Sequence, residues 1–435
     1  MNISVGKPKR HISRFFHRAR SAARLKQLGP GWITGAADDD PSGIATYSQS
    51  GAQFGLALSW TLVLTFPLMV AIQLVSAHIG RVTGRGLAFN MATILPRSAV
   101  LALVGLLFIA NTINLGADLS AMGAAAKLIF GWGQHTFTLL FAVASLLLQM
   151  FIPYRRYARF LMVLTLSLFA YVALVFSLQV DWAAVGLSFL GGQTPVTKDA
   201  AITVVAIFGT TISPYLFFWQ SAQEVEEVNH HADEQPLLDD PAEAPAAFAH
   251  IRMDTIAGMA ISNIVALAIM ISTAATLHAA GQTDIATAAD AARALEPLAG
   301  KFAFLLFSLG IIGTGLLAVP VLAGSAAYAV GDLRGWKNSL DDKPWEAVGF
   351  YSVIGVAVAL GLCIDYTGID PMKALFWSAV INGVIAVPMM VAMMVVVGSR
   401  KLMGQFTLGW GLGAWGWLST AVMAAASVAM LWLSL

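Results

Sequence analysis

Cysteine and charged residues are both scarce in this sequence. One of its 435 residues is a cysteine, Cys363, which excludes an intrachain disulfide and a cysteine-based metal cluster. Charged residues make up 11% of the chain, against about 25% in an average soluble domain. The 25 lysines and arginines nearly balance the 24 aspartates and glutamates, so the net charge indicates neither an acidic nor a basic partner. An ordinary soluble domain is therefore excluded.

Long apolar runs take the place of the missing charge. The chain is 58% hydrophobic, its mean hydropathy is +0.74, and apolar runs recur along nearly its whole length. Each run has about 20 residues, the length of a helix that spans a bilayer. We therefore predict an all-α polytopic membrane protein with about eleven transmembrane helices, at residues 29–55, 57–79, 99–126, 134–152, 157–180, 199–228, 252–278, 301–330, 346–366, 372–398 and 410–434.

The positive charges predict an orientation. Twenty of the 25 lysines and arginines fall on the N-terminal tail or on the connections that share its side of the membrane. Because cytoplasmic connections carry an excess of these residues, we expect the N-terminus in the cytoplasm and the C-terminus outside. We expect a bacterial inner membrane. Residues 1–27 read as a basic, solvated tail near anionic lipid, without a signal peptide. We expect neither a nucleic-acid partner nor an obligate protein partner.

The first predicted span is interrupted by acids. Asp38, Asp39 and Asp40 stand together at its centre and are followed by Pro41 and Gly43. Proline removes a backbone donor and glycine relaxes the helical geometry, so the helix breaks here. Such a break is tolerated within a bilayer only where the freed backbone is buried or binds something, and carboxylates at this depth indicate a function. The stretch predicts a cation site.

A second break lies in the sixth predicted span, over the residues Gly209 to Tyr215, which include Ser213 and Pro214. The two breaks are five spans apart, and because five is odd the second group of five spans crosses the bilayer in the opposite sense. This is typical of transporters built from inverted repeats, whose sites form between two discontinuous helices. We expect a transporter core at 28–400 with repeats at 28–180 and 199–398, and an additional C-terminal helix within 401–435.

The two breaks together predict an oxygen-lined site. Neighbouring residues on a helix point about 100° apart, so the three aspartates cannot share one direction, and Asp40 is best placed beside the break. We assign Asp38 and Asp39 to the entry path. Backbone carbonyls near Thr210 and Thr211 and the hydroxyls of Ser42 and Ser213 add oxygens. Such a set suits a hard cation such as Mg²⁺, Mn²⁺ or Ca²⁺, carried as substrate, and we expect no cofactor.

These motifs resemble those of the NRAMP family of divalent-metal transporters. The family carries Asp-Pro-Gly-Asn in its first helix and Met-Pro-His in its sixth, where this chain has Asp40-Pro41-Ser42-Gly43 and Ser213-Pro214-Tyr215. Residues 111–119 also resemble the family's third helix. The resemblance covers roughly 28–400. It implies two inverted five-helix repeats, as in sodium-coupled amino-acid symporters, and a metal held by Asp40 and a carbonyl near Thr210.

The chain departs from that family at the metal ligands. A metal-binding Asn is replaced by Gly43, a Met by Ser213 and a His by Tyr215. Loss of a thioether removes the preference for softer metals, and smaller residues predict a wider site for partly hydrated Mg²⁺. The pattern resembles the divergent NRAMP-related magnesium transporters. Asn382 lies near a position where the family has a polar ligand, and we place it beside the site.

Proton coupling is also expected to change. The family couples to protons through an Asp-x-x-Glu pair on its third helix, the sixth-helix histidine and arginines on its ninth helix. Here Asp118 is retained, but the partner position holds Ala121, the histidine is Tyr215, and residues 346–366 contain no arginine. A relay needs titratable groups in series, so we expect transport by alternating access with little or no proton coupling.

Other functions remain open. One alternative is a proton-coupled Mn²⁺ or Fe²⁺ importer, as in typical family members, and another is a sodium-coupled symporter of a small solute. A channel is not distinguished from a carrier. An intramembrane aspartyl protease is the enzymatic alternative, suggested by Gly116-Ala117-Asp118, but its partner motif is absent. We therefore predict a protein that is not an enzyme. Asn111 and Asn114 are expected to join helices.

Overall fold

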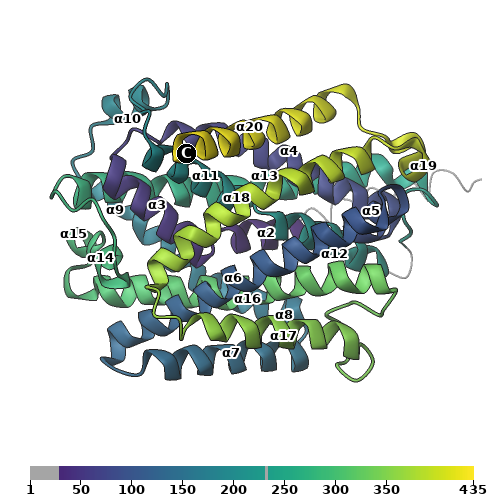
Figure 1. Cartoon of the computed structure of the whole chain (residues 1–435), viewed down its shortest axis with the longest axis horizontal. Helices are drawn as coiled ribbons and strands as arrows, with labels where there is room; N and C mark the ends of the chain where they lie inside the picture. The colour runs from purple at the N-terminus through teal and green to yellow at the C-terminus, as the bar shows by residue number, and fades with distance from the viewer. Residues whose placement is uncertain (1–28, 231–233) are drawn as a thin grey trace, which may run out of the picture.

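The structure is a computed structural model that describes residues 29–230 and 234–435, so the predicted basic tail at 1–27 lies outside the described residues. The described residues form helices and loops without strands (Figure 1). The main helices are α2 (Pro30–Asp38), α3 (Pro41–Phe54), α4 (Trp60–Thr83), α6 (Arg97–Phe130), α7 (Gln134–Phe151), α8 (Tyr154–Thr165), α9 (Phe169–Ser177), α11 (Lys198–Thr211), α12 (Pro214–His230), α13 (Ala244–Thr273), α16 (Ala303–Arg334), α17 (Val348–Ile364), α18 (Pro371–Val397) and α20 (Trp410–Ser434).

Shorter helices connect these elements and were not predicted from the sequence. They are α5 (Leu87–Ile94), α10 (Trp182–Ser188), α14 (Ala288–Arg293), α15 (Glu296–Ala299) and α19 (Arg400–Met403). Their apolar runs are too short to give a membrane signal. The additional C-terminal helix that the sequence predicts is α20.

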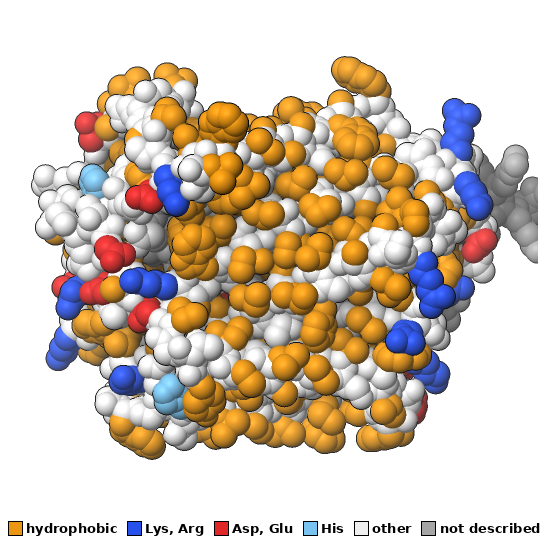
Figure 2. Space-filling model, viewed as in Figure 1, with side chains coloured by type: hydrophobic (Ala, Val, Ile, Leu, Met, Phe, Trp, Pro, Cys, Tyr) orange, Lys and Arg blue, Asp and Glu red, His pale blue; other side chains and the backbone are white. Residues whose placement is uncertain are grey.

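The helices confirm a polytopic all-α membrane protein. Eight helical segments in the described part of the chain are long and apolar enough to cross a membrane, and a bent pair, Val163–Ser177 with Trp182–Ser188, gives a ninth. The two other predicted spans correspond to α17, which has 17 residues, and to the broken pair α2 and α3. Figure 2 shows apolar side chains across the middle of the molecule and most charged side chains at its two ends. This distribution is that of a protein surrounded by lipid.

Helix neighbours follow the pattern of inverted repeats. In the chain order of spans, α3 packs against α13, and its counterpart α12 in the second repeat packs against α4. The two contacts exchange when the repeats are exchanged, while α6 and α16, which are counterparts of each other, pack together. The two helix breaks predicted from the sequence therefore lie in the same helical core, with α2 and α12 near its centre (Figure 1).

Glycine brings α2 and α13 unusually close. A Cβ atom added at Gly35 would lie 2.6 Å from the Cα atom of Gly258, and one at Gly31 would lie 2.7 Å from the amide nitrogen of Thr255. Asp254 of α13 also accepts from the backbone amides of Gly29 (3.2 Å) and Gly31 (2.6 Å) at the start of α2. Small residues allow such backbone contact between membrane helices, and a carboxylate satisfies free amides at a helix N-terminus.

Candidate functional site

The first break is organised by Asp40. Helix α2 ends at Asp38 and α3 begins at Pro41, with Asp40 as the N-cap of α3. Its Oδ1 atom accepts from the backbone amide of Gly43 at 2.8 Å and from the Ser42 hydroxyl at 2.6 Å. Aspartate is a favoured N-cap because its carboxylate satisfies an amide that has no partner within the helix. The sequence Asp-Pro-Ser-Gly thus both starts the second half-helix, α3, and fixes one oxygen of its acid.

The second oxygen of Asp40 faces two other helices. Oδ2 accepts from the Asn114 amide of α6 at 3.0 Å and from the Tyr215 hydroxyl of α12 at 3.2 Å. The Ser378 hydroxyl of α18 donates to the other end of the Asn114 amide at 2.6 Å, which fixes the amide's orientation. Asp40 is 1% exposed. Donors from three helices therefore converge on a single buried carboxylate.

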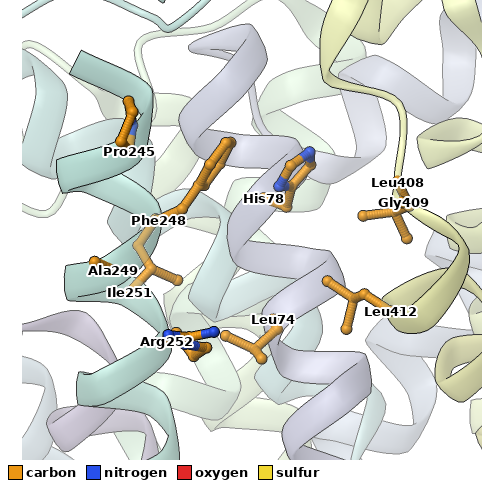
Figure 3. Close-up of a pocket in the computed structure, with 10 residues that line it drawn as sticks. All are labelled: Leu74, His78, Pro245, Phe248, Ala249, Ile251, Arg252, Leu408, Gly409 and Leu412. Atoms are coloured by element: carbon orange, nitrogen blue, oxygen red, sulfur yellow. The ribbon is translucent and has the colours of Figure 1, made fainter. Parts of the chain in front are cut away.

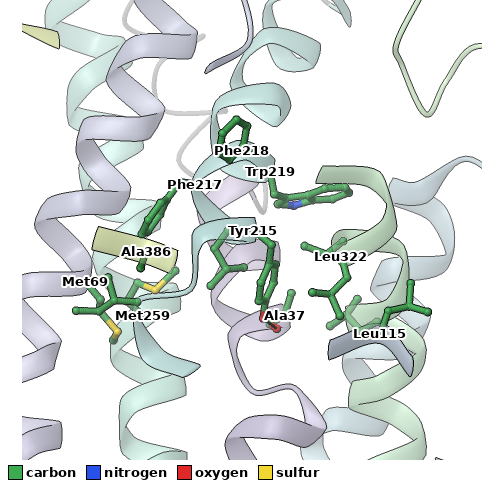
Figure 4. Packing of buried hydrophobic residues seen from close by; sticks show 14 of the residues in the cluster. Ala37, Met69, Leu115, Tyr215, Phe217, Phe218, Trp219, Met259, Leu322 and Ala386 are labelled. Carbon is green, nitrogen blue, oxygen red and sulfur yellow. Dashed lines mark hydrogen bonds between the residues drawn. The ribbon is translucent and has the colours of Figure 1, made fainter. Parts of the chain in front are cut away.

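Tyr215 reaches Asp40 from a tightly packed apolar setting. Figure 4 shows its ring among Leu115, Leu322 and Trp219, with its hydroxyl directed toward Ala37. That hydroxyl lies 3.3 Å from the Ala37 carbonyl and 3.2 Å from Asp40. The position that the sequence identified as a lost histidine is therefore a hydrogen-bond donor to the acid, held by its packing.

Asp38 and Asp39 point to a different helix. The Ser262 hydroxyl of α13 lies 2.6 Å from Asp38 Oδ2 and 2.9 Å from Asp39 Oδ1. The other oxygen of Asp38 has no hydrogen-bond partner within the described residues. Asp40 is thus directed toward α6 and α12, whereas Asp38 and Asp39 are both directed toward α13, because the chain leaves helical geometry between Asp38 and Pro41.

Side chains at the second break are directed largely at their own helix. Helix α11 ends at Thr211 and α12 begins at Pro214. The Ser213 hydroxyl donates to the carbonyls of Gly209 (2.6 Å) and Thr210 (2.9 Å), and the Thr211 hydroxyl donates to Ile207 (2.8 Å). The Thr210 hydroxyl lies 3.3 Å from Ser42 Oγ and so joins the two breaks directly.

The space expected beside Gly43 is filled. A Cβ atom at Gly43 would lie 3.2 Å from the Tyr47 ring and 3.3 Å from the Thr210 hydroxyl. The expectation of a wider site was therefore wrong at this residue in the conformation described, because an aromatic side chain one turn along α3 occupies the volume. Gly43 contributes its backbone amide to Asp40 instead.

Two further predicted residues are buried without hydrogen bonds. Both carboxylate oxygens of Asp118 and both amide atoms of Asn382 lack a partner within the described part of the chain. Asp118 lies on α6 four residues after Asn114, and Asn382 lies on α18 four residues after Ser378. Both residues therefore lie one helical turn from a member of the hydrogen-bonded chain that leads from Ser378 through Asn114 to Asp40.

Sequence reasoning missed three members of this site. Asn114 and Ser378 form a chain to Asp40, and Ser262 holds the other two acids. The spacing of Asn114 and Asp118 on one helical face was a usable signal, although Asn114 was interpreted as a purely structural contact. Asn111 does have that role, since its amide donates to the Leu322 carbonyl and to Ser325.

The site is closed on both sides. Toward the C-terminal end of α3, the Gln49 side chain accepts from the Ile285 amide at 2.9 Å and donates to the Thr283 carbonyl at 3.2 Å. Toward the start of α2, the Thr34 hydroxyl donates to Gln220 of α12 at 2.6 Å. Asp40 lies between these two contacts and is buried from both sides. No group of three histidine, cysteine, aspartate or glutamate side chains arranged to hold a metal occurs among the described residues.

Comparison with known proteins identifies the fold. Solved structures similar to this chain include a mutant of the Eremococcus coleocola manganese transporter, with a TM-score of 0.75 at 16% identity over 98% of this chain and 88% of that one. Mhp1, a nucleobase-cation-symport-1 family transporter in a closed conformation, gives a TM-score of 0.58 at 12% identity over 94% of this chain and 93% of that one. These likenesses confirm the predicted inverted-repeat fold.

Sequence comparison identifies relatives and a family. The divalent metal cation transporter MntH of Pectobacterium carotovorum is 28% identical over 401 residues, 90% of each chain. That of Yersinia pestis is 29% identical over 395 residues, 88% of each chain. These relatives are transporters, which confirms the prediction that the chain is not an enzyme. The family model described as natural resistance-associated macrophage protein-like matches residues 31–433, and the chain therefore belongs to the Nramp family.

Proposed function

We propose that this chain moves a divalent metal cation across the membrane and that Asp40 is the charged ligand of that cation. The observation that carries the proposal is the position of Asp40, a buried carboxylate at a helix break on which donors from three helices converge. Buried acids within a membrane protein are costly and mark ion pathways. The relatives named as divalent-metal and manganese transporters support the same substrate class.

Binding requires an exchange of partners around Asp40. Amide and phenol hydrogens cannot coordinate a cation, so a metal at Oδ2 would displace the donor atoms of Asn114 and Tyr215. The carbonyls of Ala37 and Thr210 and the Ser42 hydroxyl supply oxygens from the two breaks. The proposed site therefore uses Asp40 as its charged ligand, the backbone of both breaks as neutral ligands, and Asp38 and Asp39 as nearby negative charge.

We propose Mg²⁺ or Mn²⁺ as the cation, on the chemistry of these ligands. Carboxylate, carbonyl and hydroxyl oxygens suit both ions. The family's thioether position is Ser213, whose hydroxyl already donates to two carbonyls of its own helix. A partly hydrated ion needs the Tyr47 ring to move, because that ring fills the space beside Gly43.

We further propose alternating access with little or no proton coupling. The two closures differ in composition, with Gln49 holding a loop on one side and Thr34 and Gln220 joining helices on the other, so each can open separately. Asp118 is the one acid retained from the family's proton relay, and it has no hydrogen-bonded partner within the described residues. On the positive-inside rule, we place the N-terminus in the cytoplasm of a bacterial cell and the C-terminus outside.

The test is metal uptake into proteoliposomes, comparing Mn²⁺ and Mg²⁺ while lumenal pH is recorded. We expect uptake of at least one of these metals by the wild type, none by Asp40→Ala, and unchanged uptake by Asp290→Asn, an acid in a surface capping box. Normal uptake by Asp40→Ala would overturn the site, and acidification matching metal influx would overturn the absence of coupling. Failure of the wild type to move either metal would overturn the function.

A further inference from the structure

A groove remote from Asp40 lies between α4, α13 and the start of α20. Its volume is about 360 Å³ (Figure 3). Its walls are mainly aliphatic and aromatic, and its lining residues are Leu74, His78, Pro245, Phe248, Ala249, Ile251, Arg252, Leu408, Gly409 and Leu412. Ligand pockets typically measure about 300–1,000 Å³ and are mostly apolar with a few polar groups. The groove has this composition, and it is formed in part by the additional C-terminal helix.

The polar groups of this groove have different roles. The His78 ring stacks on Phe248, with centroids 4.5 Å apart and planes at 14°, and its Nε2 atom lies 2.6 Å from the Phe406 carbonyl. His78 is therefore part of the wall. Arg252 is exposed and forms no ion pair among the described residues. Figure 3 shows its side chain beside Leu74 at one end of the groove. The groove thus pairs an apolar slot with one unneutralised guanidinium.

The position of the groove restricts what can occupy it. The groove is lined by the C-terminal half of α4 and by the starts of α13 and α20. These parts belong to the side that the lysines and arginines assign to the cytoplasm. Arg252 begins the seventh predicted span, at the level of lipid headgroups. Arg400 and Lys401 add positive charge on α19, which packs against α4. Anionic lipids are attracted to such basic pockets between transmembrane helices on the cytoplasmic side.

From these observations we infer that the groove binds one anionic phospholipid of the cytoplasmic leaflet. The phosphate pairs with the Arg252 guanidinium, a geometry that suits a planar set of N–H donors. An acyl chain lies along Leu74 and Leu412. The inference does not depend on which cation the Asp40 site takes.

Lipid bound in the groove is connected to α2 through helix α13. Arg252 and Asp254 are two residues apart on α13, about 200° around the helix, so they face opposite sides. Asp254 holds the start of α2, while Arg252 faces the groove. A lipid bound at Arg252 therefore stabilises the helix that keeps α2 in place, and we expect anionic lipid to raise the melting temperature of the protein.

The test is native mass spectrometry of the full chain with phosphatidylglycerol or phosphatidylcholine of identical acyl chains. We expect the wild type to retain one phosphatidylglycerol about fivefold more strongly than phosphatidylcholine. The reason is that one arginine near an anionic lipid contributes about 1 kcal/mol to binding. Arg252→Gln should abolish this preference and Arg252→Lys should keep most of it. Arg97→Gln, an exposed arginine outside the groove, should behave as the wild type.

A second variant, Leu412→Trp, and a melting-temperature measurement keep the inference testable if Arg252→Gln folds poorly. Leu412→Trp fills the groove without changing charge, so it should reduce retention of both lipids and remove the rise in melting temperature that phosphatidylglycerol gives the wild type. Equal retention of the two lipids by the wild type would overturn the inference. So would full retention of phosphatidylglycerol by both Arg252→Gln and Leu412→Trp.

Discussion

The two helix breaks are counterparts in the inverted repeats, yet they use their side chains differently. At the first break, one oxygen of Asp40 caps its own helix α3, and the other is met by donors from α6 and α12. At the second break, Ser213 and Thr211 donate back to carbonyls of α11. One break presents a charged side chain, and the other presents backbone carbonyls and the neutral hydroxyls of Thr210 and Tyr215. Equivalent positions in the two repeats therefore need not carry equivalent chemistry. We expect side-chain substitutions to reduce metal uptake more at the first break than at the second.

The largest effect is expected for Asp40→Asn. The substitution keeps the shape of the side chain and removes the charge. Attraction between unit charges about 4 Å apart is on the order of 4 kcal/mol at an effective dielectric constant of about 20, so we expect metal uptake to fall at least about 100-fold. Initial rates in proteoliposomes and calorimetric binding measure this, with Asp290→Asn as the control. Binding within a few fold of the wild type would mean that the first break is not the charged one.

Asn114→Ala should have the next largest effect. It removes a donor from Asp40 and leaves the Ser378 hydroxyl without its acceptor at the amide. A hydrogen bond to a charged group contributes about 1.5–3 kcal/mol, so we expect roughly a tenfold or greater change in the KM for metal. Asn111→Ala is the matched control one turn earlier, because its bonds join α6 to α16.

The two asparagine variants separate function from stability. Asn111→Ala should lower the melting temperature and leave KM unchanged, whereas Asn114→Ala should change KM. If both variants changed only the melting temperature, Asn114 would be a structural residue, as the sequence first suggested.

Tyr215→Phe should have a smaller effect. The ring stays in its packed position and only the hydroxyl is lost, with its contacts to Asp40 and the Ala37 carbonyl. The bond to Asp40 is longer than that of Asn114, 3.2 Å against 3.0 Å, so we expect the lower end of the range for a charged acceptor, about 1.5 kcal/mol, or roughly a tenfold change in KM. Uptake curves for Mn²⁺ and Mg²⁺ measure it. A loss as large as that of Asp40→Asn would show that the phenol does more than position the acid.

Ser213→Ala should have the smallest effect, less than about twofold, because the hydroxyl donates within its own helix. Ser213→Met should instead shift the preference from Mg²⁺ toward Mn²⁺, since a thioether favours softer metals. Competition uptake with the two metals measures both variants. If Ser213→Ala lost as much uptake as Asn114→Ala, the second break would also act through a side chain.

The sequence predicted the features that depend on local chemistry. Hydropathy located the spans, and proline and glycine next to Asp40 and Ser213 located the breaks, because both effects are set by neighbouring residues. It did not predict which side chains meet Asp40, because that depends on how α6, α12 and α18 are rotated about their axes. Gly43 shows a further limit. A missing side chain was interpreted as open space, but Tyr47 lies one helical turn away and fills it.

The contact between α2 and α13 has a consequence for protein engineering. Gly35 and Gly258 leave no room for a methyl group between the two backbones, so a single alanine at either position would act as a wedge. The wedge would separate α2 from α13 and strain the bonds of Asp38 and Asp39 to Ser262, while the contacts of Asp40 with α6 and α12 lie outside this seam. This seam is therefore the simplest place in the molecule to trap an open state for structure determination.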